Sequence, residues 1–384
     1  MEEEALEEVA PVEVGRIYIV LFFFALTGNI QSQSCDTSEV RIIFVGDVLG
    51  HMPVLKASYD SGHDIYNFDA CYQYLKPFIS HADIAIANLE VPLAGKPYSG
   101  YPQFSSPDDL AAGVKNAGFN ILITANNHCL DKGKKGLTGT LNALDSIKIV
   151  HTGSFRNQAE RDSVYPLIIE KNKFRIALLN YTYGTNGFIP DEPVKINYID
   201  TSQIKADILT AKKKNADIII ATMHWGTEYE RSANEDQKKM AAFLVKQGCY
   251  LVVGSHPHVI QPIEIFYPDT LDSTRIVPVV YSVGNFISNQ RDRYRDGGLA
   301  FEISFERTNK IIVKDFNYLP IWVLKGVLHN KYNYYLIPVP YYHENPEIFP
   351  ISSEDRTKLE QFNDDTRKLL NNIPENFFYT TVKE

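Results

Sequence analysis

Short apolar runs alternate with amphipathic stretches along most of the chain. The runs cover residues 40–45, 82–87, 119–124, 175–180, 216–221, 250–254 and 275–283. Between them, the apolar spacing predicts helices over 105–118, 201–215 and 233–246, with Gly118 and Gly248 as stop signals. Strands that alternate with helices are typical of a layered α/β protein.

The C-terminal part of the chain has a different sequence pattern. The segments LAFEISFE and KIIVKDFNYLPIWVLK predict hairpin strands, and a tyrosine-rich stretch and a polar helix over 352–371 follow them. We expect three parts: an N-terminal targeting segment (1–35), a main domain (36–330) and a C-terminal extension (331–384) packed on that domain.

An apolar run at residues 17–27 precedes the α/β pattern. It is shorter than the ~20 residues of a membrane-spanning helix, but it matches the ~7–15 residues of a signal-peptide core. Ser34-Cys35 then resembles a bacterial lipoprotein cleavage site. We therefore expect export to the periplasm or the outer face of the cell envelope, with a membrane contact through this segment or a lipid on Cys35. A buried N-terminal helix is the alternative, and the lack of an amphipathic pattern disfavours it.

Composition narrows the class of protein. The chain has 384 residues, of which 44% are hydrophobic and 22% charged, so it can bury a large core. Its formal net charge of −9 argues against a nucleic-acid partner, which needs a basic surface. The four cysteines are scattered without a CxxC pair, so they signal neither a zinc ribbon nor a disulfide scaffold.

Polar side chains that can bind metals follow six of the apolar runs. They are Asp47, Asn88 with Glu90, Asn126-Asn127-His128, His224, His256 with His258, and Asn285. Most have a simpler interpretation when taken alone, such as a turn residue or a hydrogen-bonded histidine. His256 and His258 differ, because they lie two residues apart after a glycine, and we expect an extended chain to direct both rings to one side. Ligands gather at the carboxyl ends of strands in sheets of this kind, so together they predict one site. Carboxylate, amide and imidazole groups suit one or two divalent ions such as Zn, Mn or Fe(II).

Six sequence blocks give the chain a family resemblance. GDVLG, ANLEVPL, TANNHCLDKG, MHWGTEY, GSHPHVIQP and YSVGNFIS occur in this order over residues 41–288. They are similar to the signature blocks of the bacterial CapA family of poly-γ-glutamate capsule biosynthesis proteins, within the calcineurin-like metallophosphoesterase superfamily. The resemblance implies a four-layer α/β fold, a β-sandwich flanked by helices, with the metals at its rim.

The resemblance also implies roles for individual residues. Asp47 and His258 would bind the first metal, Glu90 would bridge, and Asn127, His224 and His256 would bind the second. His128 resembles the histidine that protonates the leaving group or steadies the phosphate, and Asp131 would hold its other nitrogen. The superfamily's first histidine is replaced by Leu49. His51 and Asn88 are further candidates for metal or substrate contacts, and one metal, two metals or a weakened pair remain open.

Three functions follow as hypotheses. The first is a metal-dependent hydrolase of an anionic phosphoester or polyglutamate-type substrate, in capsule biosynthesis. The second is a non-catalytic, membrane-anchored protein that binds an anionic polymer or the capsule synthase. The third is hydrolysis of γ-glutamyl amide bonds by the same metals. Arg291, Arg293 and Arg295 follow the YSVGNFIS block, and the first two, with Asn285, are candidates for substrate binding. Because Asp292 and Asp296 are interleaved, a solvated charged loop is the alternative.

Overall fold

The computed structural model describes residues 37–268 and 275–374 of the chain. These residues belong to one compact unit. The apolar run at 17–27 and Cys35, on which the expectation of export rests, lie outside the described residues. Across the described part of the chain, no helix is both long and apolar enough to cross a membrane.

The larger of two sheets combines a parallel half with an antiparallel half. β1, β4, β5, β6 and β15 pair in parallel, whereas β16, β17 and β18 add to β1 as antiparallel strands. The strand order is β18 (Lys331–Pro338), β17 (Ile311–Leu328), β16 (Gly297–Arg307), β1 (Ser38–Val48), β4 (Ile84–Leu89), β5 (Ile121–Ile123) and β6 (Val150–Thr152), with β15 (Asn285–Ile287) beside β1.

The second sheet is parallel in its centre and antiparallel at both edges. Its order is β13 (Ile263–Phe266), β14 (Val277–Val280), β12 (Leu251–Ser255), β11 (Ile218–His224), β9 (Phe174–Thr182) and β8 (Leu167–Lys171). Two short pairs lie outside these sheets: β2 (Tyr59–Asp60) with β3 (Ile65–Tyr66), and β7 (Ser154–Phe155) with β10 (Lys195–Ile196). All seven apolar runs of the sequence contain a strand.

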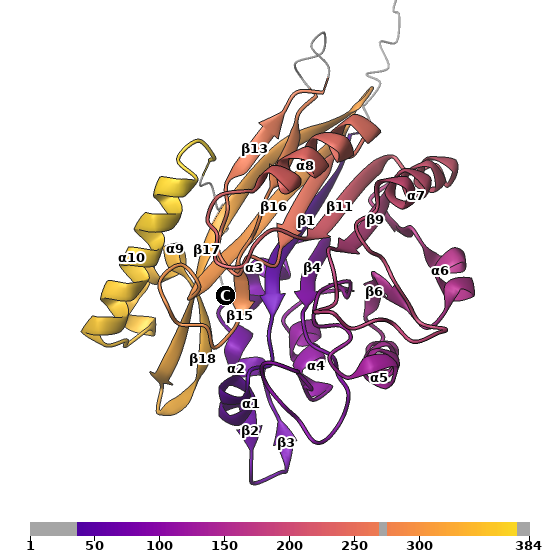
Figure 1. The fold of residues 1–384 in the computed structure, drawn as a ribbon. Coiled ribbons are helices and arrows are strands. Elements are labelled where there is room, and N and C mark those ends of the chain that lie inside the picture. Colours follow the sequence, from indigo (N-terminus) through magenta and orange to yellow (C-terminus); the bar gives the residue numbers. More distant parts are fainter. Residues whose placement is uncertain (1–36, 269–274, 375–384) are drawn as a thin grey trace, which may run out of the picture. The chain divides into compact units, whose positions relative to one another are not determined.

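The two sheets pack face to face (Figure 1). One buried cluster joins their inner faces and includes Phe44 and Ile86 of the larger sheet with Ile176 and Ile220 of the smaller one. Because the side-chain period of a strand is two, alternate residues of the same strands point outward, and Ile43 and Ala177 belong to separate outer clusters.

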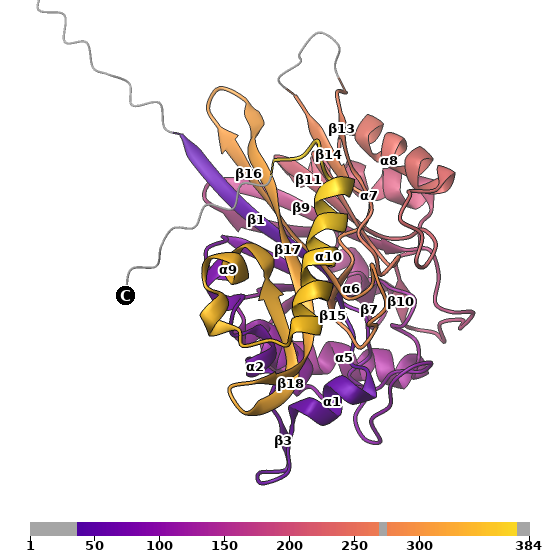
Figure 2. The same cartoon turned by 90° about the vertical axis from the view of Figure 1, so that its left-hand side faces the viewer.

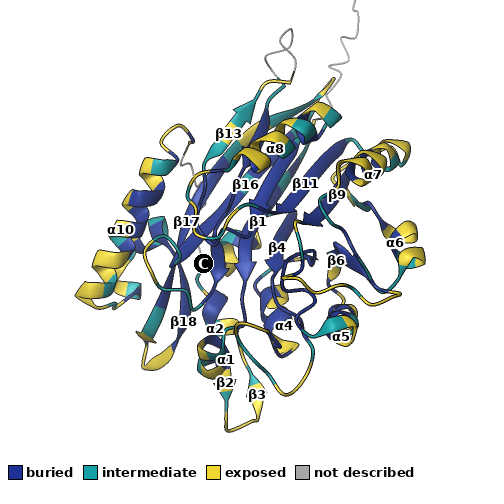
Figure 3. Cartoon of the chain, viewed as in Figure 1, coloured by how far each residue is buried: buried dark blue, intermediate teal, exposed yellow. Residues whose placement is uncertain are grey.

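Helices cover both outer faces, and their solvent sides are exposed (Figure 3). The larger sheet carries α1 (Met52–Ser58), α2 (Asp69–Tyr72), α3 (Lys76–Ile79), α4 (Asp109–Asn116) and α5 (Gly133–Ser146). The smaller sheet carries α7 (Thr201–Lys213) and α8 (Glu235–Gln247), and α6 (Gln158–Val164) precedes β8. Helix, sheet, sheet and helix are the four layers predicted from the sequence, so the predicted fold class is confirmed.

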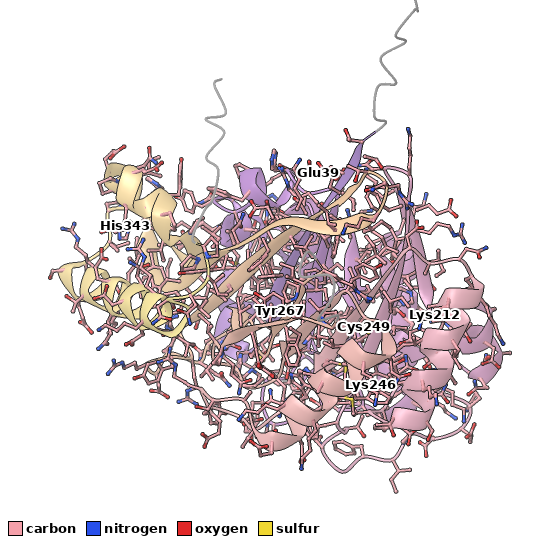
Figure 4. All side chains as sticks on the ribbon, turned by 90° about the horizontal axis from the view of Figure 1, so that it is seen from above. Glu39, Lys212, Lys246, Cys249, Tyr267 and His343 are labelled. Carbon is pink, nitrogen blue, oxygen red and sulfur yellow. The ribbon has the colours of Figure 1, made fainter. Side chains whose placement is uncertain are left out.

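The helices predicted from the sequence lie close to their expected bounds, with one exception at a helix start. Asn234 and Gln237 form a capping box at the start of α8, and Gly248 ends it with a left-handed φ of 104°. Seen from above, α7 and α8 lie side by side (Figure 4), and Lys212 Nζ donates to the Gln247 carbonyl at 2.9 Å. The predicted start of α4 near Ser105 is wrong: the helix begins at Asp109, and Asp108 caps it without a side-chain hydrogen bond.

The chain after residue 330 is part of the sandwich. β18 is the edge strand of the larger sheet, and α9 (Val339–Glu344), a short 3-10 helix (Pro346–Ile348) and α10 (Ser353–Leu369) follow it (Figure 2). Leu359 and Phe362 of α10 pack into the central cluster. They cover the inner face of the antiparallel strands, next to the area covered by the second sheet.

Candidate metal centre

The predicted side chains converge at the carboxyl ends of the parallel strands. Asp47 pairs with Asn88 on one side and with Asn285 on the other. In the second sheet, His224 is the last residue of β11 and pairs with Ser255, the last residue of β12. The remaining candidates, Glu90, Asn127, His128, His256 and His258, lie in the loops that follow β4, β5 and β12. Apart from Ser255, all of these residues are at most 4% exposed.

Gly46 explains why Asp47 reaches this position. A Cβ atom at residue 46 would lie 1.7 Å from the Gly284 carbonyl oxygen, so only glycine permits the approach. The β1 register shifts between Val45 and Asp47, and the Asp47 amide donates to the Gly284 oxygen at 3.2 Å. The GDVLG block is thus a structural requirement for bringing Asp47 beside Asn285.

One group of potential ligands consists of Asp47, Glu90 and His258, whose donor atoms all lie within 4.8 Å of one another. His258 Nδ1 is 3.1 Å from Asp47 Oδ2, and its Nε2 is 3.8 Å from Glu90 Oε1. Burial raises the pKa of Asp47, but hydrogen bonds from His258 and Asn88 outweigh it and hold that pKa below its usual value.

A second group consists of Glu90, His224 and His256. His224 Nε2 lies 3.4 Å from Glu90 Oε1 and 2.9 Å from Asn127 Oδ1, so the Asn127 amide oxygen lies next to this group. Burial, followed by the neighbouring histidines, lowers the pKa of His256 to about 3. A neutral imidazole is the form that binds metals. Glu90 belongs to both groups, which is the position of a bridging carboxylate.

The unsatisfied atoms of this site support a bound cation. Both carboxylate oxygens of Glu90 and Nδ1 of His256 are buried without a hydrogen-bond partner among the described residues. Burial and the nearby Asp47 raise the pKa of Glu90 well above its usual value. A buried carboxylate without donors is destabilising, and a divalent ion removes that penalty. Mixed oxygen and nitrogen donors suit Zn, Mn or Fe(II), so the residues present fit the expected metals.

The backbone at the two histidines is strained. His256 and His258 have φ values of 98° and 57°, in the left-handed region that favours glycine. Such conformations cost about 1–3 kcal/mol each and persist where the surroundings enforce them. Our expectation that an extended chain would direct both rings to one side is therefore wrong: the segment after β12 is a bend. The rings nevertheless converge, with centroids 6.0 Å apart.

Asn88 orients its neighbours through both ends of its amide. Its Nδ2 donates to Asp47 Oδ1 at 2.8 Å and lies 3.3 Å from His224 Nδ1, while its Oδ1 accepts from Asn126 Nδ2 at 3.4 Å. The side chain thus links a residue of the first group to one of the second.

His128 and Asp131 form a buried pair beside the ligand groups. His128 Nδ1 lies 2.8 Å from Asp131 Oδ2, which also accepts from the Phe104 amide at 2.8 Å. The Phe104 ring packs edge-on against the imidazole with centroids 4.8 Å apart. With Nδ1 engaged, Nε2 is the nitrogen left for a reacting group.

His51 lies at the margin of the site. It is the N-cap residue of α1, its Nδ1 accepts from the Asn289 amide at 3.3 Å, and it belongs to neither ligand group. Burial, followed by His258 and His128, lowers its pKa to about 4. Leu49 is buried, as expected for a side chain that cannot bind a metal.

The substrate-binding candidates lie in different settings. Asn285 Oδ1 is 3.1 Å from His258 Nδ1, so Asn285 contacts the ligand groups. Arg293 pairs with Asp365 of α10 through two 2.8 Å hydrogen bonds, and Arg291 packs over the Trp322 ring at 5.4 Å. The guanidinium groups of both arginines are thus engaged by α10 and β17 rather than by the ligand residues.

Two tyrosines beside the histidines were not among the sequence candidates. The Tyr183 ring lies 4.6 Å from the His256 ring, and the Tyr229 ring lies 6.2 Å from the His258 ring. Burial, followed by Glu228 and Glu90, raises the pKa of Tyr183 to about 12, so its hydroxyl is protonated at neutral pH. Tyr183 directly follows β9, the one central strand whose carboxyl end had no assigned residue, and Tyr229 lies within the MHWGTEY block.

Two solved structures match the chain at low sequence identity. The chain matches Haemophilus influenzae NAD nucleotidase with a TM-score of 0.49, 14% identity, and coverage of 88% of this chain and 64% of that one. It matches the calcineurin-like phosphoesterase YfkN from Bacillus subtilis with a TM-score of 0.44, 13% identity, and coverage of 85% and 99%. Because both scores lie below 0.5, family membership rests on sequence.

The sequence comparisons identify the family. The chain is 28% identical over 311 residues to the PGA biosynthesis protein CapA of Bacillus subtilis (strain 168), with 75% of each chain covered. It is 27% identical over 281 residues to the capsule biosynthesis protein CapA of Bacillus anthracis, with 69% of this chain and 64% of that protein covered. The family model for bacterial capsule synthesis protein PGA_cap matches residues 41–290. The expected resemblance is confirmed, and the chain belongs to the PGA_cap family of bacterial capsule synthesis proteins.

Proposed function

We propose that this chain is a divalent-metal-dependent hydrolase of an anionic phosphoester, acting in capsule or poly-γ-glutamate biosynthesis. The family and the names of its CapA relatives support the biological setting. The observation that carries the proposal is the position of Glu90, which belongs to both potential ligand groups and has two buried oxygens without a partner. A carboxylate shared in this way could bind both ions of a two-metal site. In such sites the metals lie ~3.5–4 Å apart.

The ligand residues would bind ions at two positions. Asp47 and His258 would hold one ion, His224 and His256 with the Asn127 oxygen would hold the other, and Glu90 would bridge. When bound, such a pair supplies Lewis-acid stabilisation of the charge that develops on the phosphoryl oxygens. The burial of the ligand residues lowers the local dielectric constant and strengthens these interactions.

His128 is the proton donor in this proposal. The 2.8 Å contact with Asp131 fixes the ring and selects Nδ1–H, so the imidazolium donates from Nε2 to the leaving oxygen. Asp131 itself receives a second hydrogen bond from the Phe104 amide, which keeps the carboxylate in place. The chain therefore carries the orienting group, the donor and the ligand set that phosphoester hydrolysis requires.

Metal content is the first test. Elemental analysis would compare the wild type with His256→Ala and Glu90→Gln, and with His343→Ala, an exposed histidine paired with Glu360, as control. About two equivalents in the wild type and the control, with a loss in both site variants, would support the paired centre. One equivalent lost only in His256→Ala would indicate a single site at His224 and His256. No metal in protein purified without chelator would refute the proposal.

Turnover separates the hydrolase from the alternatives. Phosphate release from phosphomonoesters and phosphodiesters that stops in His256→Ala but not in His343→Ala would support phosphoester hydrolysis. Cleavage of γ-glutamyl peptides with the same dependence would redirect the proposal to amide hydrolysis. Metal binding without either activity would favour an accessory role in binding the polymer or a synthase, to which the replacement of the superfamily's first histidine by Leu49 also points.

Location at the cell envelope is part of the proposal. The support is the apolar run at 17–27 followed by Cys35. Fractionation of cells that produce the full chain and a Cys35→Ser variant tests it. Membrane association that is lost in Cys35→Ser supports lipid anchoring, whereas recovery of both chains in the cytoplasm contradicts export.

A further inference from the structure

An arginine lies on an aromatic ring next to the candidate metal ligands. The Cζ atom of Arg295 is 4.4 Å from the centre of the Tyr229 ring, and the centre of that ring is 6.2 Å from the centre of the His258 imidazole. Tyr229 belongs to the loop after β11 and Arg295 to the loop after β15. Two loops that are distant in sequence thus place a cation at one side of the site.

The backbone of Tyr229 is held in place by the segment that contains His256 and His258. Its amide donates to the Pro257 carbonyl at 2.8 Å, between the two histidines, and its φ of 69° is left-handed. The fully buried Gln261 donates from Nε2 to the Glu230 carbonyl at 2.7 Å and holds the next residue of the loop. A non-glycine residue keeps such a backbone conformation only where its surroundings enforce it.

The Arg295 end is fixed through Asn285. Asn285 Nδ2 donates to the Arg295 carbonyl at 2.8 Å, and Asn285 Oδ1 lies 3.1 Å from His258 Nδ1. Both residues of the pair are therefore anchored to the surroundings of His258. With both backbones held in place and the Arg295 guanidinium against the Tyr229 ring, less conformational freedom is lost when a ligand binds there.

The Arg295 guanidinium has a partner that a ligand can replace. It pairs with Asp292, three residues earlier, whose side chain is 76% exposed. Exposed ion pairs contribute little to stability, so a carboxylate of a bound molecule can take the position of Asp292. Arg293 differs, because its bidentate partner Asp365 is only 11% exposed. Among the three arginines of this loop, Arg295 combines an exchangeable partner with a position beside the ligands.

We propose that Arg295, supported by Tyr229, binds a carboxylate of the substrate next to the bond that is hydrolysed. This inference rests on the proposed phosphoesterase function and narrows its substrate to phosphoesters with a carboxylate on the leaving group. The planar fork of an arginine matches a carboxylate through two hydrogen bonds, as the pair of Arg293 and Asp365 illustrates.

The test compares two probes that differ in one carboxylate: phenyl phosphate and 4-carboxyphenyl phosphate. Binding to the full-length, metal-loaded protein is measured by calorimetry, and hydrolysis by phosphate release. The wild type is expected to bind the carboxylated probe roughly 10-fold more tightly, and Arg295→Gln should remove that preference. In hydrolysis the change should fall on KM rather than on kcat, because the arginine does not touch the reacting atoms.

Two variants serve as controls. Arg293→Gln should keep the preference for the carboxylated probe, because the Arg293 guanidinium pairs with Asp365 of α10. Asp292→Asn should strengthen this preference, because it removes the competing carboxylate. Equal binding of both probes by the wild type, or an unchanged preference in Arg295→Gln, would overturn the inference. An Arg295-dependent preference without hydrolysis would support it while refuting the phosphoesterase function. Hydrolysis that does not depend on Arg295 would refute the inference while supporting the phosphoesterase function.

Discussion

The Asn88 side-chain nitrogen donates a 2.8 Å hydrogen bond to Asp47 Oδ1. It also lies 3.3 Å from His224 Nδ1, so one amide sets the orientation of ligands that belong to different groups. Residues that orient ligands in this way typically contribute about 10–100-fold to metal affinity. Asn88 therefore contributes to metal binding through the ligands that it orients.

Replacement of Asn88 by leucine, which has a similar volume, is expected to weaken metal binding by about 10–100-fold. It should also lower the free energy of unfolding by about 1–3 kcal/mol, because buried partners are left unsatisfied. Metal titration and urea unfolding measure the two effects. Asn116→Leu, at the exposed end of α4, is the control. Unchanged metal affinity in Asn88→Leu would show that Asp47 and His224 keep their orientation unaided.

Glu90→Gln is expected to act in opposite directions on metal binding and on the stability of the metal-free chain. The folded pKa of Glu90 is raised by burial and by Asp47, so in the wild type the folded state holds the proton more tightly than the unfolded state. Stability from this group is present below pH 4.5 and is lost as the pH rises toward the folded pKa, by at most about 1.4 kcal/mol per pH unit. Glutamine does not titrate, so Glu90→Gln removes this loss of stability with rising pH.

Urea unfolding at pH 5 and pH 7.5 with chelator, together with metal analysis, tests this prediction. Glu90→Gln should lose the metal yet show a smaller decrease in stability with pH than the wild type. The exposed Glu347→Gln is the control and should follow the wild type in both measurements. A parallel decrease in Glu90→Gln would contradict the assignment of a strongly raised pKa to Glu90.

His128→Gln is expected to lower kcat by about 10²–10⁴-fold while leaving the metal content unchanged, because the residue donates a proton and binds no metal. The loss should be larger for alkyl phosphates than for 4-nitrophenyl phosphate, whose leaving group needs no proton. Asp131→Asn keeps an acceptor for the Phe104 amide and should show a smaller loss. Equal losses for both substrate types would exclude His128 as the proton donor.

His51 is expected to make the chain less stable in acid. Its pKa is about 4 in the folded chain, compared with 6.5 for an ordinary histidine, so between these values the unfolded state takes up a proton that the folded state does not. Stability is complete above pH 6.5 and falls as the pH decreases toward 4. Between pH 7 and pH 5 the loss from this group is about 2 kcal/mol.

Urea unfolding of the metal-free wild type and of His51→Gln at both pH values tests this prediction. The wild type should lose about 2 kcal/mol more than the variant over this interval. The exposed His63→Gln serves as a control in which the wild-type loss is retained. The same loss in His51→Gln would mean that His51 titrates normally in the folded chain.

The sequence predicted the main strands and four of the ten α-helices of the described residues, because both patterns are local. Each of the seven apolar runs contains a strand, and the predicted helix over 233–246 with its Gly248 stop agrees with α8 to within two residues at each end. The start of α4 was missed because the Ser106 side chain is buried and unpartnered instead of capping the helix. Side-chain capping depends on where the chain goes next, which the local pattern does not contain.

The ligand candidates were predicted because they follow strands that end at one rim. The sequence did not show which candidates belong to which ligand group. Gly46-Asp47 was as compatible with an ordinary turn as with a ligand, and only the close approach to Gly284 distinguishes the two. The arginines show the same limit: three lie within five residues of sequence, yet one contacts α10, one a tryptophan of β17 and one a tyrosine near His258.

The sequence alone determined the layered α/β class, the family and the set of side chains at the strand ends, because periodicity and ordered motifs are properties of the chain itself. Tertiary structure decided which atoms meet. Glu90 belongs to two ligand groups, Asn88 holds ligands of both, and Tyr229 carries Arg295 to His258. These relations join residues that are tens to hundreds of positions apart, and packing of the two sheets and their loops fixes the distances between them.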